Sequence, residues 1–218
     1  MRRAVFATGA VAVLMGVIGY QLIAADQKAR STAAAVSDMA LPEYDSSGAL
    51  LRPIDFEKWV VVGTSVGMGY LDGEKADPNN PGQFHNVYLQ PQAFDHYVAT
   101  GEFPEQTVFI VTNNESQRTK RDGDHSVLKS GFFAAPTKGL EVSVKDSRRF
   151  PEGWGYYMFL ETDQKPVGKE RPAGKPYARQ ACYDCHAEHG ATDHVFTQFY
   201  SVLTAARKKH LTENPPAP

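Results

Sequence analysis

The sequence predicts an α+β fold, mainly an antiparallel β-sheet with a few helices. Six segments between positions 59 and 160 are rich in β-branched and aromatic residues, as strands are. Only two segments carry apolar residues at the spacing of a helix face. Stretches rich in Pro, Gly, Asn and Asp predict exposed loops at 72–83 and 164–175.

The predicted strands follow one another along the chain. Thr107–Thr112 is nearly all β-branched or aromatic. In Leu140–Lys145 the apolar residues alternate with Glu141, Ser143 and Lys145, which predicts a half-buried strand. The other predicted strands are Trp59–Gly63, Phe84–Leu89, Val127–Ala134 and Trp154–Leu160.

Two helices complete the prediction. The first has an apolar face formed by residues 94, 97 and 98, and Gly101 is its expected C-terminal cap. In the second, Asp193 is the expected N-terminal cap, residues 196–203 supply the apolar face, and the helix ends in the basic run 207–209.

Residues 182–186 read Cys-Tyr-Asp-Cys-His, the C-x-x-C-H signature of c-type haem attachment. At this spacing, the thiols of Cys182 and Cys185 reach the two vinyl groups of one haem, and His186 places an imidazole under the iron. The chain contains only these two cysteines. The sequence therefore predicts one covalently bound haem c with His186 as the iron ligand.

Three other interpretations of the motif were considered. A redox-active C-x-x-C motif requires a βαβ context, which the surrounding Pro, Gly and Lys residues do not provide. A structural zinc site could recruit His186, His189 and His194, but zinc ribbons usually bring a second cysteine pair. A disulfide between residues three positions apart would close a strained loop.

The N-terminal segment predicts export. Arg2 and Arg3 precede an apolar run from Ala4 to Ala25 that ends in small residues. The run suits a cleaved signal peptide and is just long enough to span a bilayer, so both a signal peptide and a membrane anchor over residues 1–25 remain open. Because covalent haem attachment in bacteria occurs outside the cytoplasmic membrane, we expect the protein on its periplasmic side.

The rest of the chain has the composition of one globular domain, with 42% apolar and 22% charged residues over the full length. Residues 26–40 are Ala-rich and polar and predict a tether. Residues 41–213 are expected to form the haem domain, and residues 214–218 a disordered tail. The formal net charge is −2, and no basic stripe indicates nucleic acid as a partner.

Three groups of residues carry a resemblance to a known family. They are Phe56-Glu57-Lys58-Trp59 leading into Val62-Gly63-Thr64-Ser65, Val142–Phe150 followed by Gly153-Trp154-Gly155-Tyr156, and Cys182–His186 followed by Asp193-His194-Val195-Phe196-Thr197. The chain resembles the cytochrome P460 family, which includes the β-sheet cytochromes c′. The resemblance implies a mostly antiparallel β domain with one c-type haem. It also implies binding of nitric oxide and similar gases, or oxidation of hydroxylamine.

The resemblance assigns roles residue by residue. Cys182 and Cys185 match the thioether cysteines, and His186 matches the proximal ligand. The family's hydroxylamine oxidisers also attach a lysine to the porphyrin, and that lysine falls at Val111 in this sequence. The predicted strand around Val111 contains no lysine.

A few other residues, at positions that the family resemblance does not match, are candidates for a role at the haem. Lys120 and Lys129 would need a shift of register to replace the missing lysine. Glu161 and Glu170 are candidates for a distal carboxylate by position alone, and a surface role is the alternative for both. Met158 is a candidate sixth ligand or a core residue.

The remaining histidines and aromatic residues have expected places. His189 or His194 could contact a haem propionate. We expect exposed positions for His85, His96, His125 and His210. The aromatic residues that could line a haem pocket or fill the core are Phe109, Phe132, Phe133, Trp154 and Tyr156.

Two classes of function remain open at this point. The first is an exported monohaem c-type cytochrome that binds or converts nitric oxide or hydroxylamine at a His-ligated open iron, and it could be an oxidoreductase. The second is an electron-transfer cytochrome with a six-coordinate iron, which is not an enzyme. Either would need a redox partner protein, which the sequence does not identify, and a homodimer is also open.

Overall fold

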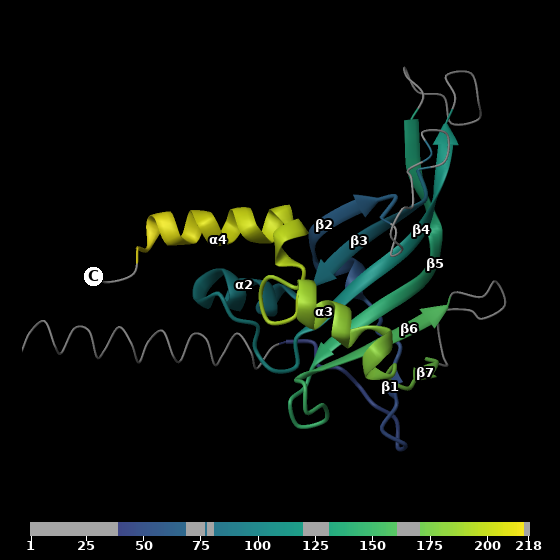
Figure 1. Cartoon of the computed structure of the whole chain (residues 1–218), viewed down its shortest axis with the longest axis horizontal. Helices are drawn as coiled ribbons and strands as arrows, with labels where there is room; N and C mark the ends of the chain where they lie inside the picture. Colours follow the sequence, from purple (N-terminus) through teal and green to yellow (C-terminus); the bar gives the residue numbers. More distant parts are fainter. Residues whose placement is uncertain (1–38, 69–76, 78–80, 120–130, 161–170, 216–218) are drawn as a thin grey trace, which may run out of the picture. The chain divides into compact units, whose positions relative to one another are not determined.

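A five-stranded antiparallel sheet forms the centre of the fold, in the order β2-β3-β4-β5-β6 (Figure 1). The strands are Val60–Val66 (β2), Gln83–Leu89 (β3), Val108–Thr119 (β4), Gly131–Lys145 (β5) and Trp154–Leu160 (β6). Strands that are neighbours in the sheet are also consecutive in the chain. The predicted α+β class with a mainly antiparallel sheet is therefore confirmed.

The computed structural model describes residues 39–68, 77, 81–119, 131–160 and 171–215. The chain divides into two units, Met1–Met39 and Ala40–Pro218, and the description concerns the second. The expected signal or anchor (1–25), most of the tether (26–40) and the last three tail residues lie outside the described residues. No helix within the described ranges is long and apolar enough to cross a membrane.

The two faces of the sheet differ. One face packs into the hydrophobic core, where the buried residues are Leu50, Phe56, Val108, Ile110, Leu140, Val142, Val144, Tyr157 and Phe159. Successive side chains of a strand point to opposite faces, so Glu141 and Ser143 lie on the other face. The half-buried strand predicted from the alternation at Leu140–Lys145 is confirmed.

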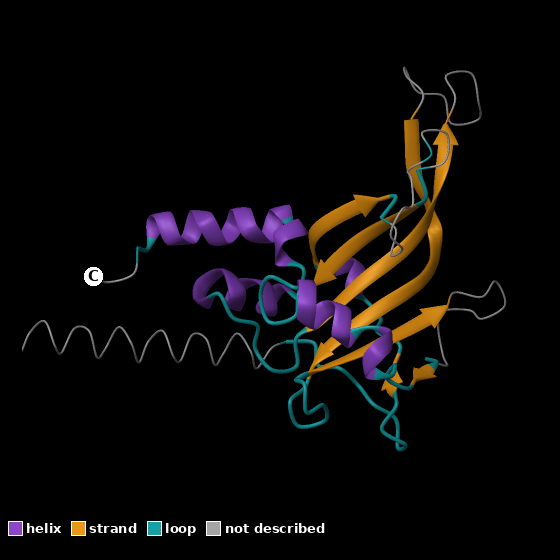
Figure 2. Cartoon of the chain, viewed as in Figure 1, coloured by secondary structure: helices purple, strands orange, loops and turns teal. Residues whose placement is uncertain are grey.

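The helices lie mainly on the face opposite this core (Figure 2). They are α2 (Pro91–Thr100), α3 (Tyr183–His189) and α4 (Ser201–Glu213), with short 3₁₀ turns at Phe56–Lys58, Arg179–Ala181 and Thr197–Phe199. Arg207 of α4 donates hydrogen bonds to the carbonyls of Val98 (2.8 Å) and Ala99 (3.0 Å), which fixes α4 to the end of α2. A small second sheet pairs β1 (Leu50–Leu51) with β7 (Ala173–Gly174).

The prediction for α2 is confirmed, and two other predictions are corrected. Gly101 ends α2 with φ 86°, a left-handed conformation that glycine adopts readily. Of the strand expected at Val127–Ala134, residues 127–130 lie outside the described residues. Residues 131–134 belong to the same long strand, β5, as the strand expected at Leu140–Lys145. The helix expected from Asp193 begins only at Ser201, because Asp193 lies in a tight turn and its carboxylate is bound elsewhere.

Candidate haem site

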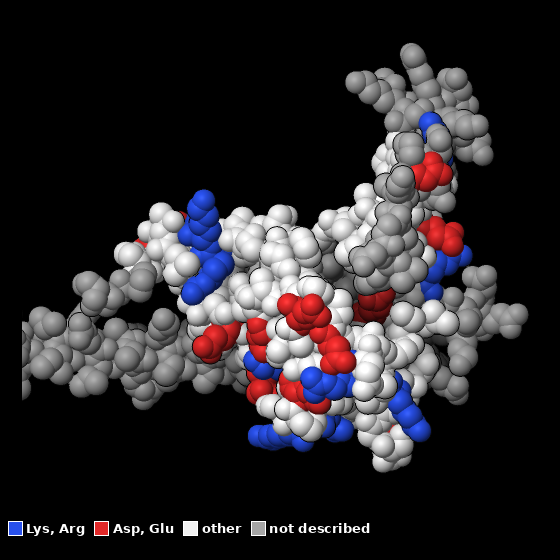
Figure 3. All heavy atoms as spheres, viewed as in Figure 1, with Lys and Arg blue, Asp and Glu red and all other residues white. Residues whose placement is uncertain are grey.

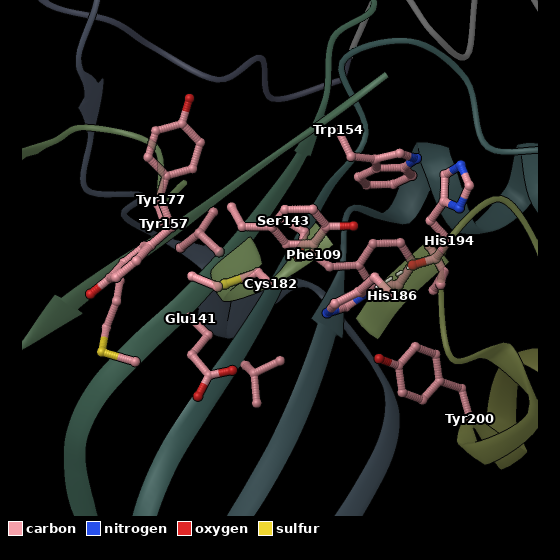
Figure 4. Close-up of a pocket in the computed structure, with 16 residues that line it drawn as sticks. Phe109, Glu141, Ser143, Trp154, Tyr157, Tyr177, Cys182, His186, His194 and Tyr200 are labelled. Atoms are coloured by element: carbon pink, nitrogen blue, oxygen red, sulfur yellow. Dashed lines mark hydrogen bonds between the residues drawn. The ribbon is translucent and has the colours of Figure 1, made fainter. Parts of the chain in front are cut away.

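A pocket lies between the non-core face of the sheet and the segment that carries the C-x-x-C-H motif. It holds about 840 Å³ of empty space, counting the part open to solvent. Figure 4 shows Glu141, Cys182 and His186 around the same space. The lining residues are Phe109, Val111, Glu141, Val142, Ser143, Trp154, Tyr156, Tyr157, Met158, Tyr177, Ala181, Cys182, His186, His194, Val195 and Tyr200.

His186 has the geometry of an iron ligand. It lies on α3, and its Nδ1 is 2.9 Å from the carbonyl oxygen of His194. When Nδ1–H donates to that carbonyl, the lone pair of Nε2 is free to bind a metal. Its ring lies between those of Tyr156 (4.5 Å between centroids) and Phe196 (4.6 Å). Burial lowers the pKa of His186, which favours the neutral imidazole that a metal requires.

The two cysteines are both free thiols. Cys182 precedes the first residue of α3 and lines the pocket, whereas Cys185 lies on an exposed part of the same helix. Burial raises the pKa of Cys182, so this thiol is held in its protonated form. The structure therefore brings Cys182 and His186 into one pocket and places Cys185 on the adjoining turn.

The outer surface of α3 is charged, in contrast to its inner surface. Arg179 pairs with Asp184 (2.8 Å) and with Glu152 (2.9 Å). Figure 3 shows acidic and basic side chains gathered together over this part of the molecule. Because ion-paired groups favour the solvent side, they orient α3 with His186 directed inward.

Glu141 is a pocket residue that sequence reasoning missed. It lies on β5 directly opposite Val111 of β4 and Met158 of β6. Its Oε1 accepts a hydrogen bond of 3.0 Å from Nδ2 of Asn113. The alternation in β5 placed Glu141 on the face away from the core, but it gave no sign that α3 would cover that face.

The cross-linking position and the other acid–base candidates have different outcomes. Val111, where the family resemblance places the cross-linking lysine, lines the pocket, and the described lining residues include no lysine. Lys120, Lys129, Glu161 and Glu170 lie outside the described residues.

Several aromatic predictions are resolved. Phe109, Trp154 and Tyr156 line the pocket, whereas Phe133 is 51% exposed. The guanidinium of Arg118 lies over the ring of Phe132, 5.5 Å from its centroid. Two pocket tyrosines, Tyr177 and Tyr200, were missed because each comes from a segment without strand periodicity.

Tyr156 adds a polar group to the pocket. Its side chain is buried, and its hydroxyl has no hydrogen-bond partner among the described residues. Burial raises the pKa of Tyr156, so the phenol remains neutral and can donate a hydrogen bond. An occupant of the pocket that carries an acceptor atom can therefore receive a hydrogen bond from this hydroxyl.

The histidine predictions are partly corrected. His194 lines the pocket and His189 is exposed. The expectation that His85 is exposed is wrong, because this residue is only 5% exposed and its Nδ1 lacks a partner among the described residues. It lies opposite Asn113 in the pairing of β3 with β4. His125 lies outside the described residues.

Together these residues fit a c-type haem. His186 offers a neutral nitrogen ligand, Cys182 a thiol at the pocket wall, Cys185 a second thiol three positions on, and Tyr156 an unpartnered donor. The aromatic walls match the apolar faces of a macrocycle. Met158 also lines the pocket and is 40% exposed.

The chain matches a known protein family. A family model described as Cytochrome P460 matches residues 53–197, about two thirds of the chain. The match begins before β2 and ends two residues after Val195, so it contains the sheet and all the pocket-lining residues except Tyr200. No curated protein matches the chain.

Proposed function

This chain belongs to the cytochrome P460 family and is a c-type cytochrome, and from that premise we propose that its pocket takes up a small nitrogen species, nitric oxide or hydroxylamine. Cys182 and Cys185 hold one haem by thioether bonds, and His186 is the only protein ligand of the iron. When bound, the haem supplies a redox-active iron with one coordination position open to a small molecule. Nitric oxide binds at the same position.

The observation that carries this proposal is the carboxylate of Glu141 in a largely apolar pocket. Each electron removed from hydroxylamine leaves together with a proton, so its oxidation needs a nearby proton acceptor. Glu141 can accept that proton, and Asn113 orients its carboxylate through the 3.0 Å hydrogen bond. An external acceptor protein would take up the electrons that this oxidation releases. Nitric oxide binding releases no proton and does not need Glu141.

This difference defines the test. In Glu141→Gln the side chain keeps its size but cannot accept a proton, so hydroxylamine oxidation by the haem-loaded protein should fall about 10²-fold or more. Binding of nitric oxide to the reduced protein, followed by its absorption spectrum, should be unchanged in the same variant. Ser143→Ala, which alters another polar lining residue, is the control. Equal rates of hydroxylamine oxidation in Glu141→Gln and the parent protein would contradict the proposal.

A second candidate function has one observation in its favour. Met158 lines the pocket and lies opposite Glu141 across β5 and β6. A thioether bound to the iron would close the open position and make the protein an electron carrier. Its 40% exposure favours a residue at the pocket mouth over a ligand at the centre. The spectrum described at the end of the Discussion separates the two functions.

A further inference from the structure

The turn behind His186 has an unusual backbone. Val195 N–H donates to the carbonyl of Thr192 at 2.8 Å, and Thr192 N–H donates back to Val195 at 3.3 Å. The two central residues, Asp193 and His194, have φ values of 48° and 61°. This is the pattern of a type I′ turn, in which Gly, Asn and Asp dominate. Asp193 suits such a turn, but His194 stands where glycine is preferred.

The residue in this unfavourable conformation is the one that contacts the iron ligand. The carbonyl oxygen of His194 accepts the hydrogen bond from Nδ1 of His186 at 2.9 Å. Backbone conformations of this kind persist only where surrounding contacts hold them. The contacts that hold the turn therefore also set the position of this acceptor.

One set of contacts binds the side chain of Asp193. Its Oδ2 is 2.7 Å from Nζ of Lys145, and its Oδ1 accepts a hydrogen bond of 3.3 Å from Nε1 of Trp154. Lys145 also donates to the carbonyl of Phe103 at 2.7 Å. Lys145 and Trp154 are register partners at the ends of β5 and β6. The sheet thus binds both oxygens of a single carboxylate.

Another close contact involves Gly190, at the end of α3. A Cβ on Gly190 would lie 2.6 Å from the carbonyl carbon of His194 and 2.8 Å from the nitrogen of Val195. Side-chain carbons do not approach backbone this closely. The His194–Val195 peptide is therefore packed directly against the end of α3.

We propose that Lys145, Trp154 and Asp193 form a clamp that positions the axial ligand. By holding the left-handed turn, the clamp keeps the His194 carbonyl within hydrogen-bond distance of His186 Nδ1. A strong bond at Nδ1 increases the electron donation of the imidazole to a bound metal. The clamp thereby affects the electron density at a bound iron without contacting the iron itself. This inference rests on the proposed role of His186 as the iron ligand.

The clamp also gives a physical reason for two of the sequence groups. Lys145 and Trp154 belong to the group formed by 142–150 and 153–156, and Asp193 belongs to the group that ends in 193–197. These are groups on which the family resemblance depends, and in the fold their side chains meet at one carboxylate. The side chains of Lys145 and Asp193 are only 19% and 30% exposed, so water screens their attraction less than on an open surface.

The test measures the iron–ligand bond in the haem-loaded protein. Resonance Raman spectra of the reduced form report the iron–imidazole stretching band, and redox titration reports the midpoint potential. In Asp193→Ala and in Lys145→Met, the band should move to lower frequency and the potential should rise, because His186 donates less electron density. Lys145→Arg should restore the parent values. Arg171→Met breaks a different ion pair, 2.7 Å long, with Glu43, and should change neither quantity.

The outcomes are separable. If the parent protein shows no iron–imidazole band, the reduced iron is not five-coordinate with His186 as its ligand, and both the proposed function and the clamp that rests on it are overturned. If the band is present but stays at the same frequency in Lys145→Met, the clamp is overturned while the proposed function stands. Lys145→Met changes no residue of the turn, so it decides the question even if Asp193→Ala fails to fold.

Discussion

At the scale of single residues, three side chains define the site. His186 presents a free Nε2 because its Nδ1 is engaged with the carbonyl of His194. Cys182 brings a protonated thiol to the pocket wall. Glu141 brings the carboxylate, and its neighbour Asn113 orients it. The role of Glu141 depends on Asn113, a residue of another strand. The role of His186 depends on a nearby residue, because its partner lies in the turn that follows α3.

His85 gives a prediction about the pH dependence of stability. Burial lowers its pKa from 6.5 in the folded protein, and the charge of Glu141 offsets this only in part. As pH falls below about 6.5, His85 binds a proton in the unfolded chain but not in the folded protein. The free energy of unfolding therefore decreases. This loss continues down to the lowered pKa of the folded state.

The measurement is urea denaturation across this range of pH. His85→Gln should reduce the loss of stability between about pH 7 and pH 5, because one fewer proton is taken up on unfolding. Leu160→Ala, which removes no titrating group from an exposed position, is the control and should keep the slope of the parent protein. A slope that is the same in His85→Gln and the parent would show that His85 is protonated equally in both states.

At the scale of elements, strand β5 separates the core from the site. The sequence indicated its alternation, whereas the order of the strands in the sheet was not predicted. The sequence did not indicate what covers the second face, because α3 and the turn at 192–195 come some 40 or more residues after Glu141. For the same reason Asp193 was taken for a helix cap: the local pattern was satisfied, but Lys145 and Trp154 bind its carboxylate instead.

Two leucines on neighbouring strands test the assignment of the faces. Leu140 of β5 is fully buried in the core, and Leu160 of β6 is 72% exposed. Leu140→Ala should lower the free energy of unfolding by about 2–5 kcal/mol, since it removes buried methyl groups and leaves a cavity. Leu160→Ala should change it by less than about 0.5 kcal/mol. Urea unfolding of both variants at one pH measures the difference, and equal losses would refute the assignment.

At the scale of the whole molecule, two of the three sequence groups that indicated the family supply residues to one pocket. The match over residues 53–197 contains the sheet, α3 and the clamp, but not α4. The C-x-x-C-H motif alone predicts the covalent attachment of the haem, which stays a prediction. The depth and polarity of the pocket could not be predicted, because Glu141, Tyr177 and Tyr200 reach it from three separate segments.

The export prediction is tested on the mature protein. The intact mass under denaturing conditions should exceed that of the polypeptide by one haem, and it should also show whether residues 1–25 have been removed. Both a cleaved and an uncleaved N-terminus agree with a haem domain outside the cytoplasmic membrane. A haem-loaded protein recovered from the cytosol would contradict export, and a mass without haem would contradict covalent attachment. Cys182→Ala with Cys185→Ala is the control that should lose the haem.

The central claim is an open, His-ligated iron in a c-type haem without a lysine cross-link. The absorption spectrum of the reduced protein, recorded before and after addition of nitric oxide, tests it most directly. We expect an ordinary high-spin c-type spectrum, because Val111 offers no amine to the porphyrin, and an immediate change on addition of nitric oxide. A low-spin spectrum with a Met-type charge-transfer band that Met158→Ala abolishes would contradict the open iron. A Soret band shifted far to the red would contradict the absence of a cross-link.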